Sequence, residues 1–217
     1  MLISDSARVL FVHVQKTAGS TIDRALQDNL SDIREIKGLG RHAHLGRILK
    51  AEPALSGYFI FGFVRNPWDR MVSWHQMIVR MDEAAKKEDQ YAEHVRRRLE
   101  RNAFWAEAAA EFPRFEDFIL RGPDRFPRMR VPQIDYLTAG DRRADFIGRQ
   151  ESFDADFAAV CEKIGLPPFE PVPRNVDKSE RPHYSTFYTD EMRDRIAELF
   201  AADIEEFGYT FERPGAQ

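Results

Sequence analysis

The stretch FVHVQKTAGSTIDRAL, residues 11–26, most constrains how this chain can fold. Val9–Val14 is a valine-rich apolar run typical of a buried strand, and Thr21–Leu30 repeats its apolar residues with the period of a helix. The six residues from Lys16 to Thr21 hold a lysine, a glycine and three hydroxyl groups. Because a helix N-terminus presents unpaired N–H groups and partial positive charge, the pattern predicts an anion held at the start of this helix.

A second unit of the same kind follows. Tyr58–Val64 is a nearly continuous apolar run, and Asn66 and Pro67 after it are typical of the first residues of a helix. The remaining elements expected from the sequence are mostly helical segments across residues 82–121, a strand over Ala144–Gly148, a helix from Ser152 to about Gly165, and a helix from Thr189 to Gly208. Strands separated by helices predict an α/β fold, with a parallel sheet flanked by helices on both faces.

Composition limits the class of protein. The 217 residues, 43% of them hydrophobic, predict a single domain over residues 1–217 with a helical elaboration. The formal net charge of −4 argues against a broad nucleic-acid surface. One cysteine excludes an internal disulfide framework, the first residues lack the pattern of a secretory signal, and no apolar run reaches membrane-spanning length. We therefore expect a cytoplasmic protein with no membrane span.

The two strand-to-helix turns are the candidate binding elements. In a parallel sheet they should lie side by side at the carboxyl ends of the strands. Gly19 lets the backbone approach an anion, while Lys16 and the hydroxyls of Ser20 and Thr21 complete a phosphate cradle. The second turn offers two residues for a second anion, Arg65 at the strand end and Ser73 eight residues later. The alternatives are a capped helix start with a solvated lysine, and a structural salt bridge from Arg65 to Asp69.

Taken together, the two turns resemble a known family. QKTAGST resembles the 5′-phosphosulfate loop of the sulfotransferases, and VRNPWDRMVSWH resembles their 3′-phosphate motif. Later segments such as VPQIDYLT, ADFIGRQESF and KSERPHY match in order, so that the resemblance spans residues 8–211. It is strongest to the branch with bacterial and carbohydrate sulfotransferases, heparan sulfate 2-O-sulfotransferase among them. The segment near 82–130 matches weakly, and we expect it to be specific for the acceptor.

The resemblance implies a P-loop-like fold, PAPS (3′-phosphoadenosine 5′-phosphosulfate) as sulfuryl donor, PAP (adenosine 3′,5′-bisphosphate) as product, and an acceptor hydroxyl, with a carbohydrate or glycoconjugate favoured. Lys16 would contact the 5′-phosphate and the bridging oxygen, and Arg65 and Ser73 the 3′-phosphate. The other donor-binding residues implied are Thr17, Ala18, Gly19, Ser20, Thr21 and, from the late segment, Lys178, Arg181 and Tyr184. Trp68 is interpreted as a packing residue, with a place beside the nucleotide as the alternative.

A histidine is expected as general base, because its pKa lies near working pH. The family places a histidine before the helix that follows the second strand region, where RHAHL stands in this chain. His42 is the closer match and His44 its neighbour or support, and a surface-loop role for either one stays an alternative. His13 is interpreted as a core residue, and His75 as structural or lining the cleft. The two histidines lack further ligands at a convincing spacing, so no metal is expected.

Two other functions compete. A P-loop nucleotide kinase or NTPase shares the strand, lysine turn and helix, but the Walker pattern is absent and the lysine precedes the glycine. A nucleotide-binding module without catalysis would bind PAP and turn nothing over. The acceptor, the position sulfated and the oligomeric state are not determined by the sequence.

Overall fold

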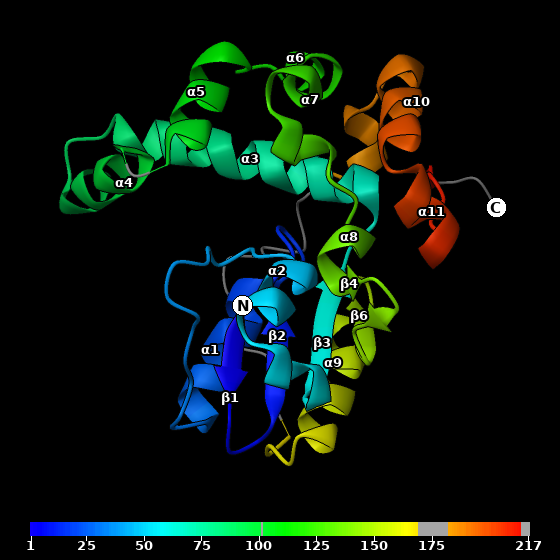
Figure 1. The fold of residues 1–217 in the computed structure, drawn as a ribbon. Helices are drawn as coiled ribbons and strands as arrows, with labels where there is room; N and C mark the ends of the chain where they lie inside the picture. The colour runs from blue at the N-terminus through cyan, green and yellow to red at the C-terminus, as the bar shows by residue number, and fades with distance from the viewer. Residues whose placement is uncertain (101, 169–181, 214–217) are drawn as a thin grey trace. The chain divides into compact units, whose positions relative to one another are not determined.

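Four strands form the central sheet, in the order β1-β2-β3-β6 (Figure 1). The computed structural model describes residues 1–100, 102–168 and 182–213. β2 (Val9–Val12), β3 (Phe59–Val64) and β6 (Phe146–Arg149) run parallel, and β1 (Leu2–Ser4) pairs antiparallel with β2. The sheet is therefore mostly parallel, as the predicted fold class requires.

One face of the sheet carries the main apolar cluster. Phe11 of β2 pairs with Phe61 of β3, and Phe61 pairs with Phe146 of β6, so that these rings share a face. The helices α1 (Gly19–Asn29) and α9 (Phe153–Lys163) cover it. The buried members of the cluster are Leu2, Val9, Phe11, Ile22, Ala25, Leu26, Phe61, Phe63, Phe157, Val160 and Cys161. Burial of this kind, at about 25 cal/mol per Å² of apolar surface, is the main stabilising contribution to such a fold.

The opposite face is covered by short helices. A Cβ built on Gly62 of β3 would lie 2.3 Å from the side chain of Leu137, which ends α8 (Ile134–Leu137). Glycine is required at this position because α8 packs directly on the strand. The helix α2 (Leu45–Ala51) packs against α8 and the short helix η1 (Pro53–Gly57). Helices thus flank both faces of the sheet, which confirms the prediction.

Two compact units make up the chain. The sheet unit comprises Met1–Asn66 and Pro132–Arg181, and the helical unit comprises Pro67–Val131 and Pro182–Gln217. In the helical unit the longest helix, α3 (Pro67–Ala85), packs against several of the other helices. The other elements of this unit are α4 (Gln90–Glu100), α5 (Ala103–Glu111), α6 (Phe115–Leu120), α7 (Gly122–Arg125), η2 (Pro127–Arg130), η3 (Tyr184–Phe187), α10 (Asp190–Leu199) and α11 (Ala201–Phe207). The prediction of a single domain stays a prediction.

Most element boundaries lie close to those expected. The predicted helix beginning at Pro67 is present, and Thr189 caps α10 by accepting a hydrogen bond from the amide of Met192 at 3.3 Å. The expected helix to Gly208 is divided at Phe200 into α10 and α11. Ser152 stands at the N-cap position of α9, but its hydroxyl bonds the side chain of Asp156 instead of a backbone amide.

Three strands were not predicted from the sequence. β1 has three residues, and β4 (Thr138–Ala139) and β5 (Arg142–Arg143), which form a separate two-stranded sheet, have two each. Runs this short carry too few alternating residues for a periodic signal.

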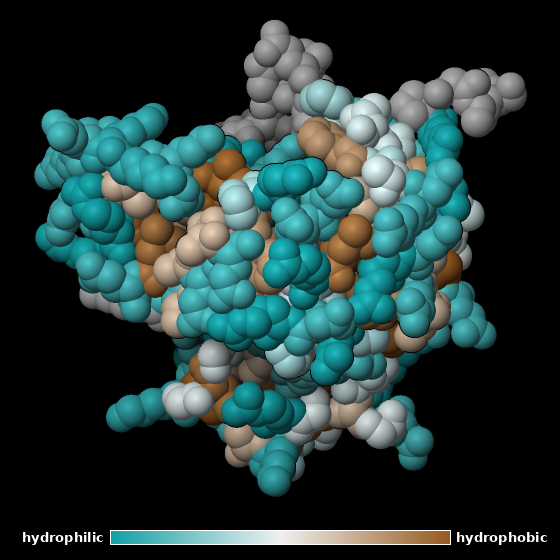
Figure 2. All heavy atoms as spheres, turned by 90° about the horizontal axis from the view of Figure 1, so that it is seen from above, coloured by the Kyte–Doolittle hydropathy of each residue, from teal (hydrophilic) through white to brown (hydrophobic). Residues whose placement is uncertain are grey.

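The surface is mostly hydrophilic in the view of Figure 2, with apolar residues scattered over it. Tyr91 on α4, 65% exposed, is the large hydrophobic residue that stands out among the described part of the chain. Most large apolar side chains of the helical unit are therefore buried within it. The scattered exposed ones need no functional explanation.

Candidate active site

The turn from β2 into α1 has an unusual backbone. Lys16 and Ala18 have φ values of 70° and 63°, a left-handed conformation that residues other than glycine rarely adopt. Between them, Thr17 is buried, and its hydroxyl donates to the carbonyl of Val14 at 3.0 Å. Each such residue costs about 1 to 3 kcal/mol, and such strain clusters at ligand-binding sites. We call residues 15–21 the lysine loop.

A histidine ring packs against the lysine loop. A Cβ built on Gly19 would lie 2.2 Å from Nε2 of His13, a distance that real Cβ atoms do not show. Gly19 has no positive φ, so contact with His13, and not backbone conformation, requires a glycine here. The approach of an anion, predicted from the sequence, stays a prediction, and contact with His13 is a separate reason for a glycine.

His13 belongs to a buried polar network that the sequence analysis missed. Its Nδ1 lies 3.2 Å from Oδ2 of Asp23, a residue of α1. The same oxygen accepts a hydrogen bond from Nε of Arg41 at 2.9 Å, and Nη2 of Arg41 donates to the hydroxyl of Ser20 at 3.2 Å. Burial acts to raise the pKa of Asp23, but the His13 hydrogen bond and the charges of His13 and Arg41 outweigh it and lower that pKa. Asp23 is therefore ionised at neutral pH.

His42 is attached to this network through the backbone. Its Nδ1 donates to the carbonyl oxygen of His13 at 2.9 Å, and the two rings meet edge to face with centroids 4.6 Å apart. Burial, together with the nearby charge of His13, lowers the pKa of His42 to about 3. His42 is thus a neutral imidazole at ordinary pH. With its proton on Nδ1, the other ring nitrogen, Nε2, is a proton acceptor.

His44 has different neighbours. Its Nδ1 donates to the carbonyl oxygen of Asp135 at 3.2 Å, and its ring stacks on Tyr136 with centroids 4.0 Å apart. It occupies the N-cap position of α2, with no capping hydrogen bond from its side chain. The structure therefore links His42 directly to the residue that packs on the lysine loop, and it links His44 to the α8 segment.

The second turn is held by buried side chains. Gln133 is fully buried; its Oε1 accepts from the amide of Arg65 at 3.0 Å, and its Nε2 donates to the carbonyl of Arg65 at 2.8 Å. The carboxylate of Glu151 accepts from the amide of Asn66 at 2.6 Å. Nη1 of Arg65 donates to the carbonyl oxygen of Lys16 at 3.3 Å. The two predicted turns are thus in contact, as expected for the ends of adjacent parallel strands.

Comparison with known proteins agrees with this arrangement. The model of a protein family described as the sulfotransferase family matches residues 1–210. The chain belongs to the sulfotransferase family. An uncharacterized protein of Archaeoglobus fulgidus is 31% identical over 111 residues, which cover 51% of this chain and 71% of that protein.

Two curated relatives of the sulfotransferase family are carbohydrate sulfotransferase 14 from Homo sapiens and from Mus musculus. Each is 25% identical over 179 residues, which cover 77% of this chain. The chain spans about half the length of these two relatives, since the match covers 47% of each.

Several predicted residues of this family member lie in the helical unit. Ser73 is half-buried on α3, and its pairing with Arg65 stays a prediction. Tyr184 is buried, and its hydroxyl accepts from the amide of Glu212 at 2.8 Å. Its role in donor binding also stays a prediction. Lys178 and Arg181 lie outside the described residues.

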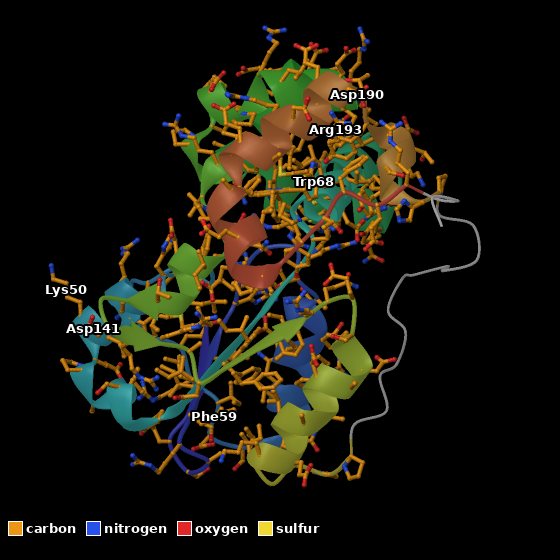
Figure 3. The ribbon with its side chains drawn as sticks, turned by 90° about the vertical axis from the view of Figure 1, so that its right-hand side faces the viewer. Lys50, Phe59, Trp68, Asp141, Asp190 and Arg193 are labelled. Atoms are coloured by element: carbon orange, nitrogen blue, oxygen red, sulfur yellow. The ribbon has the colours of Figure 1, made fainter. Side chains whose placement is uncertain are left out.

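Two other residues considered in the sequence analysis are packed inside the helical unit. Nε1 of Trp68 donates to the carbonyl of Arg193 at 3.0 Å, and Figure 3 shows these two residues near each other. His75 is buried against the rings of Phe115 and Phe118, with Nε2 placed 3.2 Å from the carbonyl of Pro113. Trp68 is buried, in agreement with the packing role predicted for it, and His75 is likewise packed among neighbouring side chains.

Within the described ranges, 1–100, 102–168 and 182–213, no group of three or more His, Cys, Asp or Glu side chains is placed to hold a metal ion. None of the helices in these ranges combines the length and the apolar character needed to cross a membrane.

Proposed function

We propose that this chain transfers the sulfuryl group of PAPS to a hydroxyl of a carbohydrate or glycoconjugate acceptor. Membership of the sulfotransferase family supports the reaction class, and the names of the two carbohydrate sulfotransferase relatives support the acceptor class. The observation that carries the proposal is the 3.3 Å contact between Nη1 of Arg65 and the carbonyl of Lys16. It brings together the two turns that would bind the two phosphate ends of one nucleotide.

The lysine loop would hold the 5′ end of the donor. Its fit to an anion rests on the first-turn amides of the eleven-residue helix α1, the side chain of Lys16, and the hydroxyls of Ser20 and Thr21. Lys16 places positive charge where the leaving phosphate oxygen gains negative charge. Thr17, Ala18 and Gly19 contribute backbone groups to the same loop.

The second turn would hold the 3′-phosphate of the donor. Arg65 is 7% exposed, Gln133 bonds its backbone, and its Nη1 already bonds the carbonyl of Lys16, so that little side-chain freedom is lost on binding. Ser73 would add a hydroxyl from α3, and Lys178, Arg181 or Tyr184 would add a contact from the late segment. These assignments follow the family resemblance.

When bound, PAPS supplies an activated sulfuryl group. Nε2 of His42 accepts the proton of the acceptor hydroxyl as the acceptor oxygen forms its bond to sulfur and the bond from sulfur to the phosphate oxygen breaks. The hydrogen bond from Nδ1 of His42 to the carbonyl of His13 fixes the ring and the tautomer for this role. The negative charge of a donor in the lysine loop favours the protonated imidazole, and so raises the pKa of His42 from its low value in the free chain.

The helical segment near residues 82–130 would select the acceptor. The proposed location of the protein is the cytoplasm.

The first test is a thermal shift with PAP, which should raise the melting temperature, while ATP with magnesium should raise it less. A rise in melting temperature with ATP and magnesium but none with PAP would favour a nucleotide kinase or NTPase.

The second test is incubation with sulfur-labelled PAPS and a panel of saccharide, lipid and amine acceptors, read by mass increase. Transfer to a saccharide hydroxyl is the expected result. PAP binding without transfer to any acceptor in the panel would favour a nucleotide-binding module without catalysis.

A further inference from the structure

Arg41 stands outside the lysine loop in the sequence, yet its side chain reaches the loop. Nη2 of Arg41 donates to the hydroxyl of Ser20 at 3.2 Å, and Nε donates to Oδ2 of Asp23 at 2.9 Å. The side chain of Arg41 is 39% exposed, whereas that of Asp23 is 13% exposed. One edge of the guanidinium is therefore anchored in the interior, and the rest of it lies at the surface beside the loop.

The guanidinium has donors left for a ligand. It carries five N–H groups, and the contacts to Asp23, Ser20 and Nδ1 of His13 engage only those on Nε and Nη2. Within the described residues, Nη1 of Arg41 has no hydrogen-bond partner. A planar guanidinium with two further N–H groups is suited to the oxygens of a phosphate or sulfate group.

We propose that Arg41 is a further donor-binding residue, which contacts the 5′-phosphate end of the nucleotide and is positioned there by Asp23. The proposal rests on the proposed function, because the lysine loop is assigned to the 5′ end there. Arg41 then places a second positive charge beside that of Lys16, and it directly precedes His42 in the chain. Asp23 is a positioning residue: its carboxylate binds both Nε and Nη2 and so fixes the guanidinium beside the loop, where Nη2 also reaches Ser20.

The network explains why an acidic residue lies so close to an anion site. A carboxylate near a phosphate is unfavourable unless its charge is compensated. Here the hydrogen bond from His13 and the charge of Arg41 compensate Asp23, and both act to lower its pKa. The remaining oxygen of Asp23, Oδ1, is buried and has no hydrogen-bond partner among the described residues. The carboxylate thus serves to orient its neighbours from the interior.

The experiment compares two ligands in several variants by titration calorimetry. PAP carries both phosphates, and adenosine 3′-phosphate lacks the 5′-phosphate. Arg41→Gln should weaken PAP binding about 10- to 100-fold, the expected result of losing a hydrogen bond between charged groups, and should leave adenosine 3′-phosphate binding nearly unchanged. Asp23→Asn should act in the same direction with a smaller loss, because Arg41 is present but less well oriented.

Arg24→Gln is the matched control. Arg24 lies on the exposed side of α1 and pairs with Asp28, so that its removal takes away one arginine charge near the loop without removing a contact to Ser20 or Asp23. Arg41→Lys is the second variant should Arg41→Gln fold poorly, and melting temperatures without ligand identify folded protein. Lysine keeps the charge but loses the planar fork, so PAP binding should still weaken.

The outcomes separate the two proposals. If the wild-type chain does not bind PAP, the proposed function fails. If the wild-type chain binds PAP and Arg41→Gln binds it as well as Arg24→Gln does, or more tightly, the assignment of Arg41 is overturned and the proposed function stands. An equal loss for PAP and adenosine 3′-phosphate would show a structural role for Arg41 and would also overturn it.

Discussion

The Lys16 turn and the Arg65 turn end neighbouring parallel strands, yet different interactions hold them. The first turn is local: two of its residues have a left-handed backbone, and Thr17 bonds a carbonyl three residues earlier. The second turn depends on distant parts of the chain, because Gln133 and Glu151 bind its backbone amides and carbonyl. The first turn can therefore be recognised from its own residues. The second requires a fold that brings to it two residues that are 68 and 85 positions away in the chain.

This difference also separates the two roles. Strained backbone and a lysine side chain suit a group that must respond to charge developing during the reaction. A buried arginine on a clamped backbone suits constant binding of a charge that does not change. Variants in the first turn should therefore affect turnover more than binding, and variants in the second turn should do the reverse.

The largest effect is expected from the base attached to the first turn. His42→Ala should lower kcat by about 10² to 10⁴ while PAP binding stays nearly unchanged, because the base acts on the acceptor hydroxyl. Turnover with labelled PAPS, compared at matched folded fractions, measures this.

His44→Ala is the control, since His44 contacts Asp135 and Tyr136 instead of His13. A large loss of kcat for His44→Ala with none for His42→Ala would assign the role of base to His44 instead. If neither variant loses turnover, the base lies elsewhere.

The next effect compares the two turns directly. Lys16→Ala should reduce kcat by roughly 10² to 10³ and keep part of the PAP affinity, because other loop donors remain. Arg65→Ala should instead weaken PAP binding, by about 2 to 5 kcal/mol, through loss of a charge-assisted contact. Ser73→Ala should weaken PAP binding less.

Calorimetry with PAP and single-turnover kinetics separate binding from chemistry for these variants. If a folded Arg65→Ala protein binds PAP with wild-type affinity, the 3′-phosphate assignment is wrong. Wild-type turnover in Lys16→Ala would exclude its role at the leaving oxygen.

The clamp on the second turn should affect stability. Gln133→Ala leaves the buried amide and carbonyl of Arg65 without their partner, which should lower the free energy of unfolding by about 2 to 4 kcal/mol for the two groups. Urea denaturation measures the free energy of unfolding. Saturating PAP, which binds the folded chain, should raise that free energy again and so offset part of the loss. A loss below about 0.5 kcal/mol would show that the clamp is not needed to hold the turn.

The sequence predicted the local features of the site and missed the long-range ones. The lysine loop, the start of α3 and the adjacency of the two turns follow from residue type and strand order. The partnership of Arg41 with Asp23 could not be predicted, because 18 positions separate them and Asp23 stands among apolar residues of α1. Gln133 was part of a matched segment, but nothing in its sequence shows that its amide binds the backbone of Arg65. One signal was present for Arg41, its position next to His42.

A smaller effect tests the packing of the first turn. Gly19→Ala should destabilise the fold by about 1 to 3 kcal/mol, because the new methyl group would lie 2.2 Å from Nε2 of His13. Gly46→Ala is the matched control on α2, where the nearest atom to the added Cβ is 3.8 Å away. It should stabilise the chain by up to about 1 kcal/mol through helix propensity. Equal unfolding energies for the two variants would contradict the tight packing of His13.

The smallest expected effect concerns pH and tests whether His42 is neutral in the folded chain. Burial lowers its pKa from the usual 6.5 to about 3, so between these two pH values the unfolded chain binds a proton that the folded chain does not. The contribution to stability is complete above pH 6.5 and is lost as the pH falls toward 3. It should amount to roughly 1 to 2 kcal/mol between pH 6.5 and pH 5. His42→Asn, whose amide can still donate to the carbonyl of His13, should flatten the dependence of the unfolding free energy on pH in this range. It should not abolish it, because burial also lowers the pKa values of His13 and His75. His94→Asn removes an exposed imidazole from α4 as the control, and a His42→Asn curve parallel to that of the wild type would contradict a neutral His42 in the folded chain.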